Sequence, residues 1–221
     1  MKRNLDFEIL KISSMSDIEL IKMLNIIKLR DKRGLSQFEL AFLLGQRDLY
    51  VRDFERPDHT LILGLSENNT IRIIFKCELA DFVPLNNSTI NRAIRIHYHI
   101  DEQGNRNYIA EQKVGNGKWK EFLRFGDEDK DILLESSSTI TDIQVQEWID
   151  EKYHNGYFNT PKTALQIFLD CKAHFNDQVR PLFIARAIQH HTKKKKAPRL
   201  VKNRDKINDY DVFVGEILLQ K

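Results

Sequence analysis

The sequence predicts an α+β fold that is mainly helical and is divided into modules. Two changes in the spacing of apolar residues indicate this: helical spacing gives way to strict alternation near residue 90 and returns from residue 141. The length of 221 residues allows one large domain or two to three small ones, and the apolar content of 41% is enough for hydrophobic cores. We expect an irregular lead-in (1–15), a helical domain (16–85), a three-stranded antiparallel meander (86–138) and a helical module with a basic β-hairpin (139–221).

The helical domain is expected to open with a long capped helix. Ser16 and Glu19 form a capping box, in which a hydroxyl and a carboxylate bond backbone N–H groups at the helix start. Apolar residues then follow at helical spacing as far as residue 29. The helix is expected to end near Gly34, because glycine readily adopts the left-handed conformation found after helix ends.

Shorter helices are expected next. Ser36 and Glu39 form a second capping box, and Gly45 ends the helix that follows. A third helix is expected near residues 48–55. The stretch TIRIIFKCEL, residues 70–79, is ambiguous from its pattern, because a short apolar run fits a β-branched strand and a buried helix equally.

Residues 84–88 (PLNNS) predict a linker before a β-meander. Apolar and polar residues alternate from Ile90 to Ile100, which is typical of a half-buried strand. Two further strands are expected at residues 106–114 and 118–125, with glycine-containing turns between them. Residues 126–130 and 136–138 are expected to be loops.

The last module is expected to contain three helices and a hairpin. Thr141 and Gln144 resemble a capping box for the first helix, which ends near residue 155. Thr160 followed by Pro161 predicts the start of the second helix, because proline fits the first helical position. Asn176-Asp177 is expected to cap the third helix, over residues 177–191. Two strand-like runs follow, at residues 199–202 and 210–214.

A set of residues between 27 and 55 stands in a recognisable register: Ile27, Leu29, Arg30, Leu35, Ser36, Gln37, Leu40, Ala41, Leu44, Gly45, Val51, Phe54 and Glu55. In this register the chain resembles the Cro/repressor-type (XRE) helix-turn-helix family, over residues 16–85. Pro57 departs from the family, which usually has glycine there. The resemblance implies a five-helix domain, with residues 70–79 as the fourth helix and 80–84 as the fifth. It also implies that the chain binds double-stranded DNA as a homodimer.

The resemblance assigns roles to individual residues. It implies that Gln37, at the start of the second helix, contacts a backbone phosphate. Arg47 occupies the cap position of the recognition helix. Three residues occupy positions that commonly read base edges, with Arg52 beside them: Asp48, Leu49 and Asp53.

The two acidic residues fit this role poorly. A carboxylate repels phosphate and can accept only from an exposed amino group such as cytosine N4. We expect Arg47 and Arg52 to be the main side-chain contacts to DNA, and Asp48 to act mostly as a helix cap. Asp53 would accept from a cytosine amino group or hold Arg52 in place. The alternative is that each arginine neutralises its neighbouring aspartate and the helix contacts a protein.

Residues 186–206 form the most basic part of the chain, with nine basic side chains and one acidic, Asp205. Three helices followed by a basic hairpin are typical of a winged helix, in which this cluster would bind DNA phosphates. The competing interpretations are a solvated basic loop, and a helical dimerisation or effector module with a charged flap. The expected contacts are Lys193, Lys194, Lys195, Lys196, Arg199, Lys202, Arg204 and Lys206, with Arg186, Gln189 and His190 on the third helix.

Other classes of site are not indicated by the sequence. Cys77 and Cys171 have no CxxC spacing and predict buried free thiols in a reducing cytoplasm. His97, His99 and Asp101 share a strand face, but alternation alone accounts for that pattern, so no metal site is predicted. No run of 18 apolar residues indicates a membrane span, and the charged N-terminal residues predict no signal peptide.

We therefore expect a bacterial or phage-type cytoplasmic transcriptional regulator that binds DNA, for example from a toxin–antitoxin or defence locus. No nucleophile–base pair or cofactor motif indicates an enzyme or a cofactor. The alternative is a protein-interaction module whose helix-turn-helix no longer binds DNA.

Overall fold

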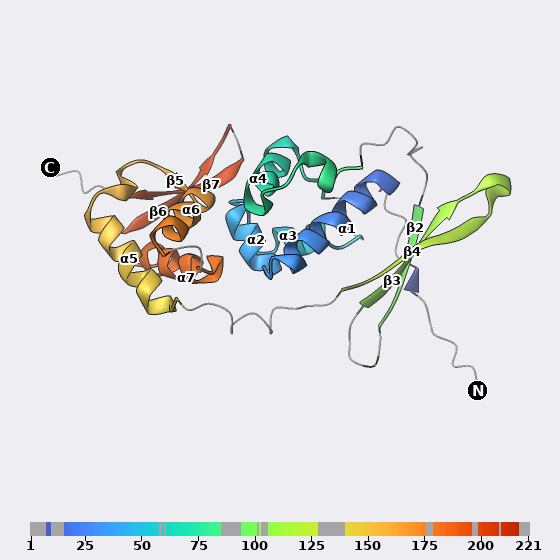
Figure 1. Cartoon of the computed structure of the whole chain (residues 1–221), viewed down its shortest axis with the longest axis horizontal. Helices are drawn as coiled ribbons and strands as arrows, with labels where there is room; N and C mark the ends of the chain where they lie inside the picture. Colours follow the sequence, from blue (N-terminus) through green and yellow to red (C-terminus); the bar gives the residue numbers. More distant parts are fainter. Residues whose placement is uncertain are drawn as a thin grey trace. The chain divides into compact units, whose positions relative to one another are not determined.

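Helices and antiparallel sheets follow one another in the computed structural model (Figure 1), so the predicted α+β class is confirmed. The structure describes residues 8–9, 16–57, 59, 61–84, 94–100, 102, 106–127, 140–175, 179–195, 199–207 and 209–216. The described residues divide into two compact units. Those of Met1–Arg33 and Arg52–Ile132 form the first unit, and those of Gly34–Val51 and Leu133–Lys221 form the second. Residues 34–51 therefore group with the C-terminal part of the chain.

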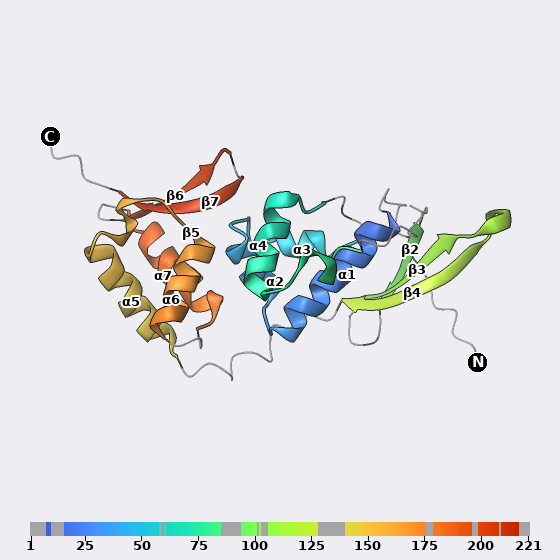
Figure 2. The ribbon, with the colours of Figure 1, turned by 45° about the horizontal axis from the view of Figure 1, so that its top comes forward.

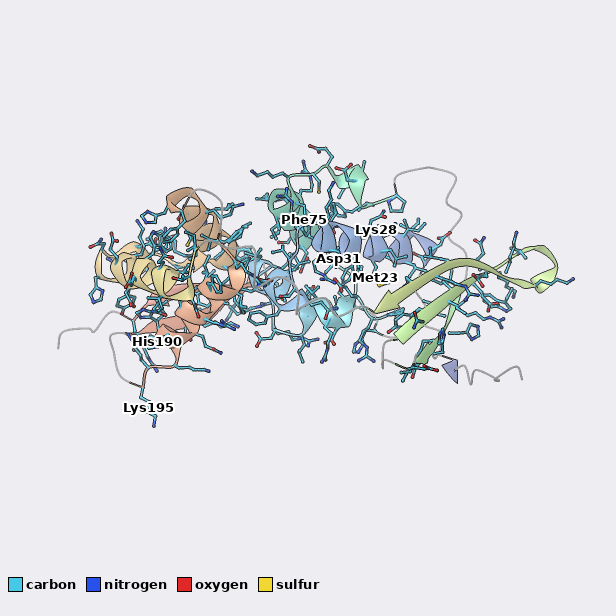
Figure 3. The ribbon with its side chains drawn as sticks, turned by 60° about the horizontal axis from the view of Figure 1, so that its bottom comes forward. Met23, Lys28, Asp31, Phe75, His190 and Lys195 are labelled. Atoms are coloured by element: carbon cyan, nitrogen blue, oxygen red, sulfur yellow. The ribbon has the colours of Figure 1, made fainter. Side chains whose placement is uncertain are left out.

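The longest helix of the first unit is α1 (Asp17–Lys32). Its expected start is confirmed, because the backbone N–H of Glu19 donates to Ser16 Oγ at 3.1 Å. The second long helix of this unit is α4 (Leu65–Phe75). Burial of apolar side chains is the main stabilising term for such helices. The buried residues include Leu20, Met23, Ile26, Ile71 and Phe75, of which Met23 and Phe75 are labelled in Figure 3.

Polar side chains of α1 reach the segments that follow it in the first unit. Arg30 makes a two-bond ion pair with Glu55, with Nε–Oε1 at 2.6 Å and Nη2–Oε2 at 2.9 Å. Both side chains are about 95% buried, at 5% and 4% exposure. Lys22 Nζ donates to the carbonyl oxygen of Leu63 at 2.9 Å. Burial lowers the pKa of Lys22. These bonds connect α1 to the residues that precede α4.

The short helix α3 (Tyr50–Phe54) confirms the third expected helix, although it begins two residues later than residue 48. The run 70–79 is helical as far as Phe75, so the choice of helix over strand is confirmed there. Its last four residues were predicted wrongly. Lys76 takes the left-handed conformation (φ 51°), which ends the helix.

The fifth expected helix, at residues 80–84, is also wrong. The chain forms a single 3-10 turn at Leu79–Asp81. The backbone N–H of Glu78 donates to Asp81 Oδ2 at 2.8 Å. This side-chain bond supplies an acceptor at the start of the turn. The turn does not extend into an α-helix.

The predicted meander is confirmed and gains a strand. Its sheet has the order β1 (Glu8–Ile9), β2 (Ile94–Ile100), β3 (Arg106–Lys113) and β4 (Trp119–Asp127), all antiparallel. The lead-in was expected to be irregular, but Glu8 pairs with Tyr98 and Ile9 with His97. The loop expected over 126–130 is wrong at residues 126–127, which belong to β4. Residues 90–93, 128–130 and 136–138 lie outside the described part of the chain.

The two faces of this sheet differ as alternation predicts. One face buries Ile94, Ile96 and Ala110, together with Tyr108, whose ring stacks on Phe125 with centroids 4.9 Å apart. On the other face, Arg95 and His97 both bond the Glu111 carboxylate, and Arg95 lies over the Trp119 ring at 4.8 Å. The Arg95 bond lowers the pKa of Glu111.

The described residues of the second unit include four α-helices and a small sheet. The helices are α2 (Gln37–Leu43), α5 (Asp142–His154), α6 (Ala164–His174) and α7 (Pro181–Thr192). The strands β5 (Lys162–Thr163), β6 (Leu200–Asp205) and β7 (Tyr210–Gly215) pair antiparallel in the order β5-β7-β6. Figure 2 shows the hairpin of β6 and β7 beside the helices α5, α6 and α7.

Two expected helix starts in this unit are wrong. The helix predicted from Thr160-Pro161 begins at Ala164, because Lys162 and Thr163 pair with β7 and Thr163 then caps α6. The helix predicted over 177–191 begins at Pro181, after Arg180 as the cap residue. Residues 176–178 lie outside the described chain. The capping box of Thr141 and Gln144 and the two hairpin strands are confirmed.

The Arg30–Glu55 pair gives a first prediction. Replacing Glu55 with alanine leaves Arg30 buried without its main acceptor, and removal of one member of a buried pair costs about 3–5 kcal/mol. We expect a loss near the lower end, because Asp31 Oδ1 lies 3.3 Å from Arg30 Nη1. Urea unfolding followed by circular dichroism measures the change in free energy of unfolding.

The matched control is Glu121→Ala in the exposed Glu121–Arg124 pair, whose side chains are 44% and 62% exposed. Exposed pairs contribute about 0–1 kcal/mol, so this variant should unfold close to wild type. Equal losses in the two variants would contradict the structural role of the Arg30–Glu55 pair.

Candidate nucleic-acid interface

The start of α2 has the local geometry that the sequence predicts. Ser36 Oγ accepts from the backbone N–H of Glu39 at 3.1 Å, and Glu39 Oε2 accepts from the backbone N–H of Ser36 at 2.9 Å. The capping box is therefore complete. Gln37 follows it and is partly exposed.

Glu39 also has a tertiary role that the capping box does not indicate. Its carboxylate is fully buried and bonds Arg180 twice, with Nε–Oε1 at 3.1 Å and Nη2–Oε2 at 3.0 Å. The backbone N–H of Leu182 donates to Oε1 at 3.3 Å. The first N–H groups of a helix have no partner within the helix, and α7 has no side-chain cap of its own. Glu39 supplies that missing acceptor from α2.

The segment after α2 is held by the β6–β7 hairpin. Gly45 has the left-handed conformation (φ 65°), as expected for a helix end, and its carbonyl oxygen accepts from the backbone N–H of Asp211 at 2.7 Å. Arg204 donates to the same carbonyl at 2.9 Å and to Gln46 Oε1 at 2.8 Å. Gln46 Nε2 donates to the Asp209 carbonyl oxygen at 2.8 Å. We call the set of Gly45, Gln46, Arg204, Asp209 and Asp211 the hairpin clamp.

The residues next to the clamp are accessible. Arg47, Asp48 and Leu49 are exposed, with Leu49 at 46%. The expected capping role of Asp48 is not observed: α3 begins at Tyr50, and the Asp48 carboxylate makes no hydrogen bond within the described residues. Tyr50 instead donates its backbone N–H to the Arg47 carbonyl oxygen at 2.9 Å.

Within α3, Arg52 and Asp53 have different environments. The Arg52 side chain is 46% exposed, whereas that of Asp53 is 5% exposed. Arg52 Nη2 lies 3.2 Å from Asp53 Oδ1. The expectation that Asp53 reads a base edge is therefore corrected, because a buried carboxylate cannot reach the edge of a base. The alternative expectation, that Asp53 holds Arg52, agrees with this contact.

The lysines after α7 form a small exposed cluster. Lys193 and Lys195 are exposed, and in the described part of the chain neither takes part in an ion pair. Lys195 projects away from the helices near the end of α7 in Figure 3. Lys194 is partly exposed, and its Nζ lies 3.4 Å from His191 Nδ1. Lys196 lies outside the described residues.

The other predicted phosphate contacts carry acidic partners. Arg199 pairs with Glu216 at 2.7 Å, and Lys202 pairs with Asp211 at 2.6 Å. Arg204 lies 3.0 Å from Asp209 and belongs to the hairpin clamp. These three side chains are still 37%, 49% and 38% exposed, and their expected contact with phosphate stays a prediction. Lys206 is exposed, as are Gln189 and His190 on α7. Arg186 is exposed and lies 3.5 Å from Asp142.

His191 connects α7 to α5 beneath the lysine cluster. Its side chain is 1% exposed, its Nε2 lies 2.5 Å from Asp150 Oδ1, and its ring stacks on Tyr153 at 5.1 Å. Burial lowers the pKa of His191, although the bond to Asp150 acts in the opposite direction. The ammonium of Lys194 can only donate, so the geometry at Nδ1 also favours neutral His191, with its proton on Nε2.

Other kinds of site find little support within the described residues. They contain no group of three or more His, Cys, Asp or Glu side chains arranged to hold a metal ion. Cys171 is buried, as predicted, and burial raises its pKa to about 12. Cys77 is only partly buried, so the prediction of a buried thiol is wrong at this position. None of the described helices combines the length and apolar character needed to cross a membrane.

Comparison with protein-family models, with curated proteins and with solved structures found no match to this chain. The candidate site is therefore defined by the positions and exposure of the residues of this chain alone. Gln37, Arg47, Asp48, Leu49 and the lysine cluster belong to the second unit, while Arg52 and Asp53 belong to the first unit. Sequence reasoning missed the Glu39–Arg180 pair, because its members are separated by 141 positions in the sequence and form no local pattern.

The hairpin clamp gives a second prediction. A Cβ atom at Gly45 would lie 2.9 Å from Tyr210 Cβ and 3.1 Å from the Asp211 backbone nitrogen. Gly45→Ala should therefore lower the free energy of unfolding by about 1–2 kcal/mol, because alanine is strained in the left-handed conformation. Overpacking against the hairpin should add about 1–3 kcal/mol to this loss. Gly117→Ala is the control, because Gly117 has φ +70° and nothing within 4 Å of its Cβ position. Urea unfolding of both variants measures the difference; equal losses would contradict the close contact.

His191 gives a third prediction. Because its pKa is lowered in the folded protein, the unfolded chain binds more protons below the ordinary pKa of 6.5. Its contribution to stability is therefore complete above pH 6.5 and is lost as the pH falls towards the folded pKa. The loss is about 1.4 kcal/mol for each pH unit between the two values. Unfolding between pH 7 and pH 5 should show this loss in wild type.

His191→Gln should remove this component of the pH dependence, and His190→Gln, which changes the exposed neighbour, should retain it. NMR titration of the imidazole signals provides a direct measurement. A His191 signal that titrates above pH 6.5 would contradict the prediction.

Proposed function

We propose that this protein binds double-stranded DNA and acts as a transcriptional regulator. The observation that carries the proposal is the order of elements in the second unit, where three helices are followed by a lysine cluster and then a hairpin. This order supports a winged-helix module, with β5 as a third strand beside the hairpin. The exposed lysines at the end of α7 provide the positive charge that DNA phosphates require.

The segment from α2 to α3 supports a second DNA contact, of the Cro/repressor type. The capping box and the left-handed Gly45 agree with the local geometry of a helix-turn-helix. In this proposal Gln37 binds a phosphate, and Arg47 and Arg52 are the main base or phosphate contacts. Asp53 is omitted from the contact surface, because it is buried against Arg52.

The proposed regulator is a homodimer, since two recognition helices can then meet successive major grooves. Analytical ultracentrifugation of the full chain measures this state directly. The alternative function, a protein-interaction module, is favoured by the exposed Leu49 and by the ion pairs of the hairpin. Those pairs leave less free positive charge than a purely electrostatic DNA surface would have.

The fourth prediction tests the phosphate contacts by their salt dependence. For a labelled duplex, the logarithm of the binding constant should fall linearly with the logarithm of salt concentration, with a slope of about −0.9 for each neutralised phosphate. The double variant Lys193→Ala, Lys195→Ala should flatten this slope by up to about 1.8. Fluorescence anisotropy over a series of salt concentrations measures the slope.

Lys202→Ala is the matched control, because Asp211 already neutralises Lys202 at 2.6 Å. Its slope should stay closer to that of wild type. An equal change of slope in both variants would contradict a contact between the lysine cluster and DNA phosphates.

The proposed DNA contact of α3 is tested with a different variant. Arg52→Ala should weaken binding to a selected sequence by about 1–3 kcal/mol if Arg52 contacts a base edge. If wild type binds no duplex even at low salt, the DNA proposal fails and the protein-interaction function takes its place. If wild type binds but Arg52→Ala leaves affinity and sequence preference unchanged, α3 does not read DNA.

A further inference from the structure

The hairpin of β3 and β4 carries a group of lysines at its tip. Gln112 is the last residue of β3 that pairs with β2, and the hairpin continues past it to its turn (Figure 1). Lys113, Lys118 and Lys120 lie in this tip and are exposed. In the described part of the chain none of the three takes part in an ion pair. We call them the tip lysines.

The carboxylates next to the tip lysines already have partners of their own. Glu111 accepts from both Arg95 and His97, and the Arg95 bond lowers the pKa of Glu111. Glu121 accepts twice from Arg124, with Nε–Oε1 at 2.6 Å and Nη2–Oε2 at 2.8 Å. The positive charge of the tip lysines is therefore available to an anionic ligand.

The tip is held in place by its own turn and by β2. The backbone N–H of Val114 donates to the Lys118 carbonyl oxygen at 2.8 Å and closes the turn. Arg95 of β2 lies over the Trp119 ring at 4.8 Å. An isolated two-stranded hairpin is only marginally stable in water, so this contact with a third strand supports the base of the tip. The tip lysines are thus carried on an ordered ribbon.

The tip lysines lie on both faces of this ribbon. Lys113 pairs with Trp119, so their two side chains share a face. Lys118 and Lys120 flank Trp119 in the sequence, and the alternation of an extended chain places both on the opposite face. A flat anionic surface would meet the lysines of one face only. A ligand with negative charge on both sides of a cleft would meet all three.

The major groove of DNA is a cleft of this kind and of the right size. Sheet layers pack about 10 Å apart, which approximates the thickness of a ribbon with its side chains. The major groove is about 12 Å wide and admits a two-stranded ribbon, whereas the minor groove is about 6 Å wide. Phosphate backbones border the groove on both sides. The major groove of duplex RNA is deep and narrow, so it fits the ribbon poorly.

We propose that the tip of the β3–β4 hairpin enters the major groove of double-stranded DNA, where the tip lysines bind phosphates on both sides. This contact belongs to the first unit. It lies outside both the segment from α2 to α3 and the lysine cluster that follows α7. The inference rests on the proposed DNA binding and adds a further binding element to it.

The test compares the full chain in three forms: wild type, a tip variant and a control variant. The tip variant combines Lys113→Gln, Lys118→Gln and Lys120→Gln, which removes three charges and keeps polar side chains of similar length. The control variant makes the same change at three other exposed lysines of the first unit, as Lys28→Gln, Lys32→Gln and Lys76→Gln. Lys28 is labelled in Figure 3.

Fluorescence anisotropy over a series of salt concentrations measures binding to a labelled DNA duplex and to an RNA duplex of the same sequence. On DNA, the tip variant should flatten the salt dependence by up to about 2.7, because each of three lost phosphate contacts contributes about 0.9. The control variant should keep the wild-type slope. On RNA, the tip variant should change the slope by less than on DNA.

A tip variant that keeps the wild-type slope on DNA, or changes it no more than the control variant does, would overturn the inference and leave the proposed function standing. An equal change of slope on DNA and RNA would overturn the entry of the tip into the major groove. Failure of wild type to bind the DNA duplex at low salt would refute the proposed function, and the inference with it.

Discussion

The buried carboxylate of Glu39 is the constraint on which the second unit depends. A charge removed from water must be paired and hydrogen-bonded, or its burial costs several kcal/mol. Glu39 meets this requirement by taking donors from two helices that lie far apart in the sequence, Ser36 of the α2 start and Arg180 and Leu182 of the α7 start. Because the same group completes both helix starts, α2 cannot leave α7 without exposing unsatisfied donors on each.

The segment between residues 34 and 55 contains a second buried carboxylate, that of Glu55, which is paired in the other unit. Glu39 is paired in the second unit, whereas Glu55 is paired with Arg30 in the first. The residues between these two anchors include the exposed Arg47, Asp48 and Leu49.

The distribution of free charge differs from the distribution of basic residues. The sequence contains a continuous basic region. In the hairpin, however, Arg199, Arg204 and Lys202 form ion pairs with Glu216, Asp209 and Asp211. These acidic residues lie close to their partners only because β6 and β7 are paired. Lys193 and Lys195, which follow α7, take part in no ion pair within the described part of the chain. A short electrostatic contact at one end of α7 is therefore better supported than a basic wing.

The sequence by itself determined the local features. Capping boxes at Ser36 and Thr141, the left-handed Gly45 and the alternation of the meander involve neighbours within a few residues, whose geometry the backbone imposes. Tertiary structure decided the burial of Asp53, the start of α6 and the pairing of Glu39 with Arg180. Each of these depends on a surface or strand supplied by a distant part of the chain, and the energy of burying a charge or pairing a strand exceeds a local preference. Sequence patterns therefore located the candidate segment, but the fold determined which of its charges remain available.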